Sequence, residues 1–265
     1  VRLRPFIFSV MKIVSWNVNS IRAREPLLEQ LIKKENPDII CLQELKTENK
    51  NIVEDFFKLY DYESICSTQK AYNGVAIAYK NQKKIKNIDL NNLNNLQARN
   101  NCILIEDINT VILNCYFPNG NPIGTEKFEL KTNWMNSILV HLKELQENYN
   151  VLITGDFNVI PQDTDAHDIK KYKNDALASR EARDFFYSYK NLDLIDPFEF
   201  EDKNTTYTFF DYKTYKFGKN EGIRIDFFLL SPVLFKSVTN RKVLKEYRDM
   251  ERPSDHCPIL LELNI

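Results

Sequence analysis

Acid, amide and imidazole side chains stand where five apolar, strand-like runs of the sequence end. They are Asn17 after VSW, Glu44 after CLQ, Asp156 and Asn158 in ITGDFN, Asp226 in IRID, and Asp255 and His256 in SDHCP. A single Asp or Asn at a strand end usually caps or turns the chain. Five such ends in one chain exceed what capping alone explains, so we interpret these residues as parts of one site.

The residue types in this set favour a hard divalent cation. Carboxylates and amides with one imidazole suit Mg²⁺, which retains several waters, better than Zn²⁺. The chain has only 3 histidines and contains neither a GxGxxG nor a Walker loop, so a zinc site and a nucleotide cradle both lack support. Metal-assisted hydrolysis of a phosphate ester is the reaction that this set serves most directly. We therefore expect Mg²⁺ as the cofactor, with Mn²⁺ able to replace it.

The segments that carry these residues alternate between strand and helix patterns. A strand at 13–16, an amphipathic helix at 25–34 and a strand at 38–42 open the chain, and Pro37 ends the helix. Further strands are expected at 74–79, 102–106, 110–117, 151–154, 206–209, 223–230, 241–245 and 258–263, and helices at 51–59, 125–146 and 179–189. Because these strands outnumber what one parallel sheet needs, the sequence predicts an α/β fold with two packed β-sheets flanked by helices.

The composition is that of an ordinary globular domain. The 265 residues are 43% hydrophobic and include 36 Lys and Arg against 37 Asp and Glu, for a formal net charge of −1. These values exclude disordered, collagen-like and membrane classes. With so little net charge, a nucleic-acid partner would have to bind a local basic face. We expect residues 11–265 to form one domain and residues 1–10 to be an N-terminal extension or tail.

The cysteine pattern bears on the cellular compartment. The chain has 5 cysteines, an odd number, no two of them form a CxxC pair, and each lies in an apolar context. We interpret them as buried reduced thiols, which predicts a cytoplasmic protein.

Seven blocks of the sequence carry a family resemblance that spans Met11 to Ile265. They are MKIVSWNVNSIRAR from Met11, LQELK at 42–46, YNGVAIAYK at 72–80, YFPNG at 116–120, GDFN at 155–158, GIRIDFFLLS at 222–231 and PSDHCPI at 253–259. In this order they resemble the blocks of the exonuclease III family of apurinic/apyrimidinic (AP) endonucleases. The resemblance implies the four-layered α/β sandwich of DNase I-like phosphodiesterases, with two packed mixed β-sheets flanked by helices.

The resemblance also implies an activity. It is that of a Mg²⁺-dependent DNA repair nuclease that cuts duplex DNA 5′ to an abasic site and leaves a 3′-hydroxyl. Trimming of damaged 3′ ends by a 3′–5′ exonuclease action is expected beside it. The partner would be double-stranded DNA rather than a membrane, and we expect the protein to act as a monomer.

Roles at the metal and at the attacking water follow from the same resemblance. Glu44 is similar to the principal Mg²⁺ ligand of the family, with Asn17 and Asp255 close by, directly or through water. Asp156, beside Asn158, is similar to the residue that orients or deprotonates the attacking water.

Four further residues are similar to family groups that face the phosphate. His256 would pair with Asp226, and its action as a base or as a charged hydrogen-bond donor stays open. Tyr116 and Asn119 would add neutral donors to the phosphate or the leaving oxygen, although Tyr116 could also be a core aromatic at a strand end.

Contacts to DNA are expected from two groups of residues. Phe209, Ile223 and Ile225 resemble the apolar pocket that receives a flipped-out, base-free sugar, and a half-buried strand is the alternative interpretation. Lys46 and Arg99 are candidates for the phosphate-binding face, and a solvated surface charge is the alternative for each.

The sequence departs from the family pattern at three positions. Leu45 stands where Thr is usual, Phe209 stands where many bacterial members have Trp, and Asn19 stands where some relatives carry an acid near the metal. Two other functions are weighed against the nuclease. One is an enzyme of the same superfamily that acts on a non-DNA phosphodiester or phosphomonoester, and the other is a catalytically inactive DNA-binding module. The intact set of strand-end residues argues against the second.

Overall fold

A computed structural model describes residues 10–80, 84–90, 98–212 and 216–265 of the chain. The helices and strands in these parts are, in chain order, β1 (Val10–Asn17), α1 (Ile21–Glu35), β2 (Ile39–Gln43), α2 (Lys50–Lys58), β3 (Tyr62–Ser67), β4 (Val75–Lys80), β5 (Ile85–Ile88), β6 (Asn100–Ile105), β7 (Thr110–Tyr116), α3 (Glu126–Gln146), β8 (Asn150–Asp156), α4 (Arg180–Lys190), α5 (Lys203–Thr206), β9 (Asp226–Leu230), α6 (Pro232–Lys236), β10 (Val238–Val243) and β11 (Ile259–Asn264). Residues 1–9 of the predicted N-terminal extension lie outside the described residues, whereas Val10 already pairs with Asn264.

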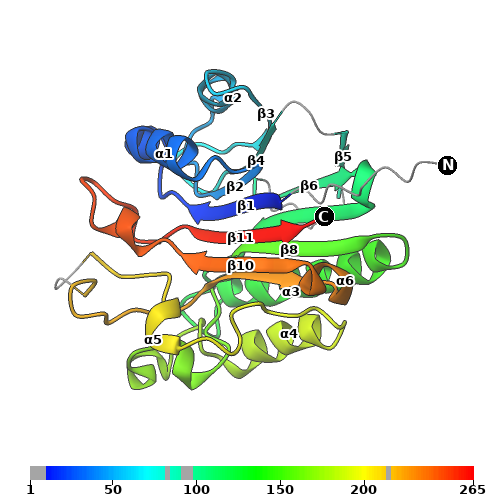
Figure 1. The fold of residues 1–265 in the computed structure, drawn as a ribbon. Helices are drawn as coiled ribbons and strands as arrows, with labels where there is room; N and C mark the ends of the chain where they lie inside the picture. The colour runs from blue at the N-terminus through cyan, green and yellow to red at the C-terminus, as the bar shows by residue number, and fades with distance from the viewer. Residues whose placement is uncertain (1–9, 81–83, 91–97, 213–215) are drawn as a thin grey trace.

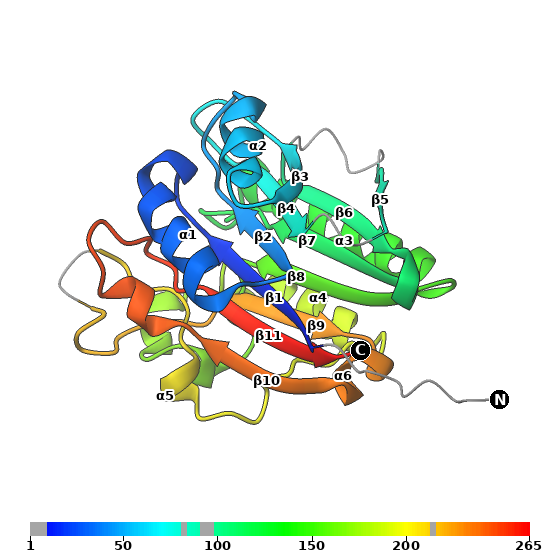
Figure 2. The same ribbon diagram turned by 45° about the horizontal axis from the view of Figure 1, so that its top comes forward.

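The described strands form two mixed β-sheets (Figure 1). One sheet has the order β10-β11-β1-β2-β4-β3, and the other has the order β5-β6-β7-β8-β9. The β1–β2 and β7–β8 pairs are parallel, and the other neighbouring pairs are antiparallel. Helices α1 and α2 cover the outer face of the first sheet, and α3 and α4 cover that of the second (Figure 2). The predicted four-layered sandwich is confirmed.

Alternating side chains of the strands build a core on each side of a sheet, because successive residues of a strand point to opposite faces. In β1, Ile13 enters the core between the two sheets and meets Ile39 and Ile112. Its neighbour Val14 enters the core beneath α1 and α2. The third core lies between the second sheet and α3, where Trp134 is fully buried. The sheets are therefore held rigidly against one another, which fixes the relative position of their strand ends.

The strand predicted at 206–209 is wrong. Residues Lys203–Thr206 form the short helix α5, whose N-cap Asp202 accepts a hydrogen bond from the Asn204 amide. This local cap outweighs the strand preference of the following Thr and aromatic residues. Phe209 makes only isolated bridges, to Ile223 and to His256.

Two other strand boundaries shift, and two strands were not predicted. The strand predicted from residue 223 begins at Asp226, and the one predicted at 241–245 is β10, Val238–Val243. The edge strands β3 and β5 carry exposed polar residues. They therefore lack the apolar run by which the other strands were predicted. All five cysteines are buried and free, as expected. No helix within the described ranges is long and apolar enough to cross a membrane.

Candidate active site

The strand register brings polar residues of both sheets to one edge. In the parallel β1–β2 pair, Asn17 lies beside Gln43, so Glu44 directly follows at the same end. In the second sheet, Asp156 at the end of β8 is aligned with Tyr116 of β7 on one side and with Asp226 of β9 on the other. The predicted convergence of strand ends is therefore present.

One buried amide joins the two sheets at this edge. The Asn17 Nδ2 group donates to Glu44 Oε1 at 2.9 Å and to Asp156 Oδ2 at 2.9 Å. Its Oδ1 atom accepts the backbone N–H of Asn19 at 3.0 Å, so the amide cannot flip without losing all three bonds. Asn17 is fully buried. It therefore sets the separation of two carboxylates that come from different sheets.

Glu44 and Asp156 have different proton affinities although they share this amide. Burial would raise the pKa of Glu44, but hydrogen bonds from Asn17 and Lys46 and the Lys46 charge lower it below its ordinary value. Burial raises the pKa of Asp156, and the charges of Asp226 and Glu44 raise it further, against the pull of His256. Glu44 is thus a stable anion, whereas Asp156 is a carboxylate that can accept a proton.

His256 sits between two carboxylates. Its Nδ1 lies 2.8 Å from Asp226 Oδ2, and its Nε2 lies 3.7 Å from Asp156 Oδ2. Burial would lower the pKa of His256, but the charges of Asp226 and Asp156 and the hydrogen bond to Asp226 raise it above its ordinary value. This favours the charged donor over the base, the two roles that the sequence left open.

A metal ion fits the donor chemistry of this cluster. Carboxylate oxygens of Glu44 and Asp156 lie within 4.8 Å of one another and of a ring nitrogen of His256. The two carboxylates are the cation donors, because a protonated imidazole has no free lone pair. The second carboxylate oxygen of Asp226, Oδ1, is buried without a hydrogen-bond partner in the described parts of the chain. Burial and the neighbouring charges of Asp226 and Glu44 raise the pKa of Asp156, and a hard dication would offset this concentration of negative charge.

Asn158 and Asn119 are brought to the cluster, and Asn158 holds Asp156. The backbone N–H of Asn158 donates to Asp156 Oδ1 at 2.9 Å, and its Nδ2 donates to Phe117 O at 2.9 Å. Asn119 Nδ2 donates to Asn158 Oδ1 at 3.4 Å. Asn158 has a φ of 48°, a left-handed conformation that Asn tolerates better than most residues.

Tyr116, Lys46 and Arg99 lie at the rim of the cluster. Burial, together with the charges of Glu44 and Asp156, raises the pKa of the Tyr116 hydroxyl well above its ordinary value. Lys46 Nζ lies 2.7 Å from Glu44 Oε2. The Arg99 guanidinium lies 4.9 Å from the Tyr116 ring centre and donates to Tyr116 O at 3.3 Å. Lys46 and Arg99 are therefore engaged with site residues and are not free surface charges.

The structure places Asp255 beside the cluster, outside the group of converging ligand atoms. Its Oδ1 accepts from Asn19 Nδ2 at 3.0 Å, and Lys46 also bonds to Asn19. The amide at position 19 thus links Asp255 to the rim on which Glu44 lies.

The residues predicted for the sugar pocket are together but differ in exposure. Ile223 and Ile225 are both 2% exposed and belong to a small core with Ile160, Ala166 and Leu177. Phe209 is half-buried, and its ring contacts that of His256 edge to face at 5.0 Å between centres. Phe209 is the member of this group that faces the reacting centre.

Sequence reasoning missed Lys131, a fully buried residue whose Nζ reaches the loops of Asn119 and Asn158. The signal was present, because Lys131 falls on the apolar face of the predicted helix, in line with Phe128, Trp134 and Ile138.

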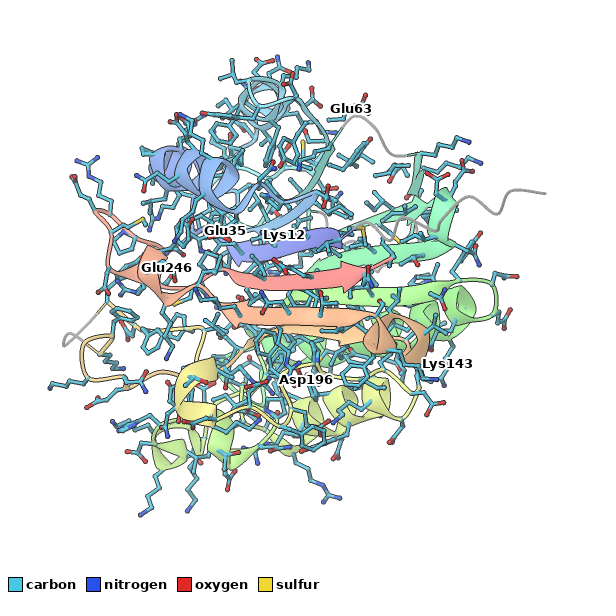
Figure 3. The ribbon with its side chains drawn as sticks, in the orientation of Figure 1. Lys12, Glu35, Glu63, Lys143, Asp196 and Glu246 are labelled. Atoms are coloured by element: carbon cyan, nitrogen blue, oxygen red, sulfur yellow. The ribbon has the colours of Figure 1, made fainter. Side chains whose placement is uncertain are left out.

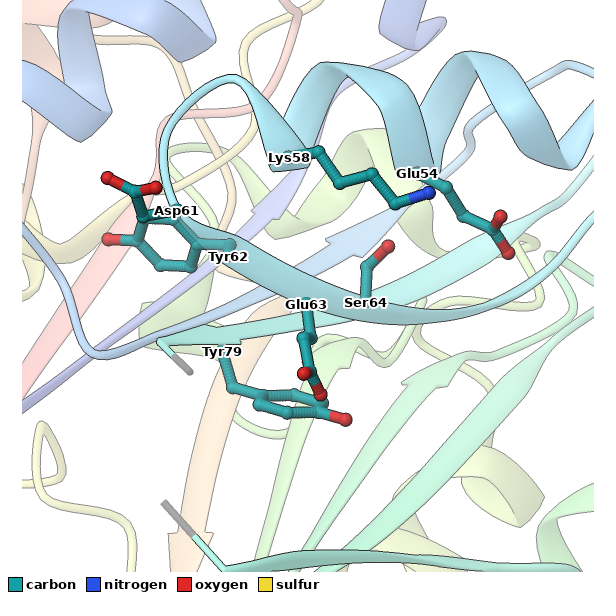
Figure 4. Close-up of a pocket in the computed structure, with 7 residues that line it drawn as sticks. All are labelled: Glu54, Lys58, Asp61, Tyr62, Glu63, Ser64 and Tyr79. Carbon is teal, nitrogen blue, oxygen red and sulfur yellow. The ribbon is translucent and has the colours of Figure 1, made fainter. Parts of the chain in front are cut away.

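A separate cavity of about 480 Å³ lies between α2 and the strands β3 and β4 (Figure 4). It is lined by Glu54, Lys58, Asp61, Tyr62, Glu63, Ser64 and Tyr79. None of these residues belongs to the strand-end cluster, so the cavity is not part of the candidate active site.

Comparisons with known proteins agree with this geometry. The endonuclease/exonuclease/phosphatase family matches residues 14–256. Exodeoxyribonuclease III of Haemophilus influenzae is 30% identical over 269 residues, which cover 95% of this chain and 99% of that protein.

Two solved structures resemble the whole described fold. They are an AP endonuclease from Archaeoglobus fulgidus and the 3′ phosphatase NExo from Neisseria bound to a product DNA hairpin. Each has a TM-score of 0.89, is 29% identical, and aligns over 96% of this chain and 100% of its own. The chain therefore belongs to the endonuclease/exonuclease/phosphatase family of hydrolases, and its predicted resemblance to exonuclease III-type nucleases is confirmed.

Proposed function

We propose that this chain is a Mg²⁺-dependent DNA repair nuclease that hydrolyses the phosphodiester 5′ to an abasic site in duplex DNA and leaves a 3′-hydroxyl. The observation that carries the proposal is the joining of Glu44 and Asp156 by the buried amide of Asn17, directly beside His256. The relatives named exodeoxyribonuclease III and AP endonuclease support DNA as the substrate. The 3′ phosphatase among the structural neighbours supports an additional action on blocked 3′ ends.

Glu44 is the residue best suited to hold the cation, because it stays ionised and lies at the rim of the cluster. The amide of Asn17 holds the carboxylates of Glu44 and Asp156 in place through its Nδ2 group, whereas its own oxygen accepts the Asn19 N–H and does not face the cation site. A bound Mg²⁺ supplies neutralisation of charge on the phosphate oxygens.

Asp156 is the proton acceptor for the attacking water in this proposal. Its raised pKa gives the carboxylate an affinity for that proton, and the Asn158 backbone N–H fixes the direction of Oδ1. A base that is already held in one orientation lowers the entropic cost of reaching the reactive geometry.

His256 and Tyr116 act on the phosphate and the leaving group. Asp226 accepts from Nδ1 and keeps the ring protonated, so Nε2–H is a charged donor that faces the reacting centre. Tyr116 keeps its proton at neutral pH and serves as a neutral donor to the leaving oxygen. Donors fixed in a site closed to water stabilise developing charge without further reorganisation.

Selection for abasic sites is assigned to Phe209 with Ile223 and Ile225. A nucleotide without a base loses no pairing when it leaves the helix, so a small apolar surface next to His256 can favour it over an intact nucleotide.

The proposal is tested with a 5′-labelled duplex that carries one abasic analogue, compared with the same duplex undamaged and with a phosphoinositide and a sphingomyelin substrate. We expect one cut 5′ to the lesion, a product that a polymerase can extend from its 3′-hydroxyl, and no turnover of the lipids. Preferred turnover of a lipid phosphodiester would instead support the non-DNA alternative. Monomeric state and cytoplasmic location stay predictions.

A further inference from the structure

We propose that Lys131 of α3 is a positioning residue that fixes the two amide residues Asn119 and Asn158 at the reacting centre. The inference rests on the proposed function for the roles of these amides. It concerns a residue outside the strand-end cluster, held one layer below it.

The Lys131 ammonium joins three loops, one after β7 and two within the connection between β8 and α4. Its Nζ donates to Asn158 O at 2.6 Å, to Asn119 O at 3.1 Å and to Ala176 O at 3.4 Å. A lysine ammonium has three N–H donors and no acceptor. The three carbonyls therefore use its whole bonding capacity, and each comes from a different loop.

This lysine is buried without an ion-pair partner. Lys131 is fully buried, and within the described residues no carboxylate lies within salt-bridge distance of it. Burial lowers its pKa to about 7, although the more distant charges of Asp156 and Asp175 act in the other direction. Lysine is almost never buried in this way unless it has partners. A residue that only filled space on this face of α3 would be apolar, like its neighbour Met135.

The loop that carries Asn119 is shaped to the lysine stem. Gly120 has a φ of 82°, and a Cβ atom at this position would lie 2.5 Å from Lys131 Cδ. The chain therefore passes over the stem with room for glycine alone. This close approach is independent of the three hydrogen bonds and shows that loop and lysine fit together.

The held carbonyls lead directly to the groups that touch the reacting atoms. The Asn158 residue whose carbonyl is held donates its own N–H to Asp156 Oδ1, and its side chain accepts from Asn119 Nδ2. The third loop is tied to the same assembly, because Ala176 N donates to Asn121 Oδ1 at 2.9 Å. Without the ammonium, three carbonyl oxygens would face one another with no donor between them.

Loss of the ammonium is therefore expected to change catalysis more than binding. Lys131→Met keeps the length and volume of the side chain and removes all donors. At saturating abasic duplex we expect its single-turnover rate to fall by about 10- to 100-fold, since small displacements of reacting groups have effects of that order. The affinity for the duplex, measured with chelator present, should change by less than about twofold.

A double-mutant cycle separates positioning from general destabilisation. If Lys131 acts through the Asn158 backbone on Asp156, adding Lys131→Met to Asp156→Asn should lower the rate little beyond Asp156→Asn alone, because the carboxylate that the Asn158 N–H orients is already absent. Met135→Ala is the matched control, since Met135 is buried on the same helix and lies in the core below the sheet. It should lower the melting temperature and leave the rate per folded molecule unchanged.

Two further arms keep the inference testable if Lys131→Met does not fold or if the wild type does not cut abasic duplex. Lys131→Gln keeps N–H donors and is expected to lose less activity than Lys131→Met. Hydrogen exchange at residues 117–122 and 157–161 should accelerate in the Lys131 variants and not in Met135→Ala, whatever the substrate. Failure of the wild type to incise contradicts the proposed function alone. Unchanged hydrogen exchange in these loops would overturn the role of Lys131. So would a double variant whose loss of rate equals the product of the losses in the two single variants.

Discussion

Two clusters of buried charged side chains lie on either side of the segment 223–226, and they differ in the balance of positive and negative charges. In one cluster, Arg224 Nε lies 3.0 Å from Asp165 Oδ1, and an Nη atom lies 2.7 Å from Asp196 Oδ2. Lys203 adds a second positive charge at 3.3 Å from Asp165. Figure 3 shows Asp196 beneath β10, on the side of α4. Two cations here meet two anions.

The strand-end cluster has an excess of negative charge. Glu44, Asp156 and Asp226, with Asp255 beside them, converge there with His256 and, at the rim, Lys46 and Arg99. The balanced cluster raises the pKa of Arg224 in spite of burial, because both of its carboxylates stabilise the guanidinium. In the unbalanced cluster, burial together with the charges of Asp226 and Glu44 raises the pKa of one carboxylate, Asp156, despite the opposing charge of His256. Buried charges that are neutralised by ion pairs within the protein hold the fold together. Buried charges without such neutralisation can instead bind a cation and a substrate.

Asp156→Asn should have the largest effect on the reaction. We expect the single-turnover rate to fall by about 10²- to 10⁴-fold, because the proton acceptor is lost, while binding of abasic duplex changes little. Its melting temperature should equal or exceed that of the wild type, since a mutually repelled charge is removed. A parallel fall in binding and rate would make Asp156 an organising residue.

Arg224→Met should have the largest effect on stability. It leaves Asp196 buried without its ion-pair partner and Asp165 with Lys203 alone, and breaking such a buried pair typically costs about 3–5 kcal/mol. Urea unfolding measures this loss, and the rate per folded molecule should stay near wild type. Arg224→Lys is the matched control, because it keeps the charge and loses the two-pronged geometry. A large loss of activity in a stable Arg224→Met protein would show that the Arg224 cluster also serves the reaction, and not the stability of the fold alone.

Glu44→Gln should weaken the binding of the metal ion by the strand-end cluster. The amide keeps the shape and the bond to Asn17 but lacks the charge that holds a hard dication. We expect the Mg²⁺ concentration for half-maximal incision to rise at least about tenfold, with partial rescue at high Mg²⁺. A wild-type rate at limiting Mg²⁺ would show that Glu44 is not the ligand.

Phe209→Ala should have the smallest effect on stability, because the ring is half-buried. A core Phe truncation typically costs about 3–5 kcal/mol, and we expect clearly less here. The ratio of incision at an abasic site to trimming of an undamaged 3′ end should shift. If stability drops sharply and both activities fall with the folded fraction, Phe209 is a core residue.

The convergence of the residues at the strand ends could be predicted from the sequence. Asn17, Glu44, Asp156, Asp226 and His256 each follow or begin an apolar run, and the register of the two sheets brings those ends together. The two-sheet architecture followed from the number of apolar runs.

Features that depend on tertiary packing were out of reach. The segment at 206–209 has a strand composition, but Thr206 ends α5 and only Phe209 makes isolated bridges, to Ile223 and His256. The pairing of Arg224 with Asp165 and Asp196 spans 59 and 28 residues, and nothing in the local pattern specifies it. Arg99 was expected on the phosphate-binding face, whereas its contact with Tyr116 depends on how the strand ends meet.

The central claim is that the excess negative charge of the strand-end cluster requires a bound divalent cation for the reaction. The measurement is the single-turnover rate on abasic duplex after chelation and again after stepwise return of Mg²⁺, with the melting temperature followed in parallel. We expect no incision in chelator and full recovery of the incision rate when Mg²⁺ is returned. The melting temperature should rise with the concentration of the cation. Incision at the wild-type rate in chelator would contradict this claim.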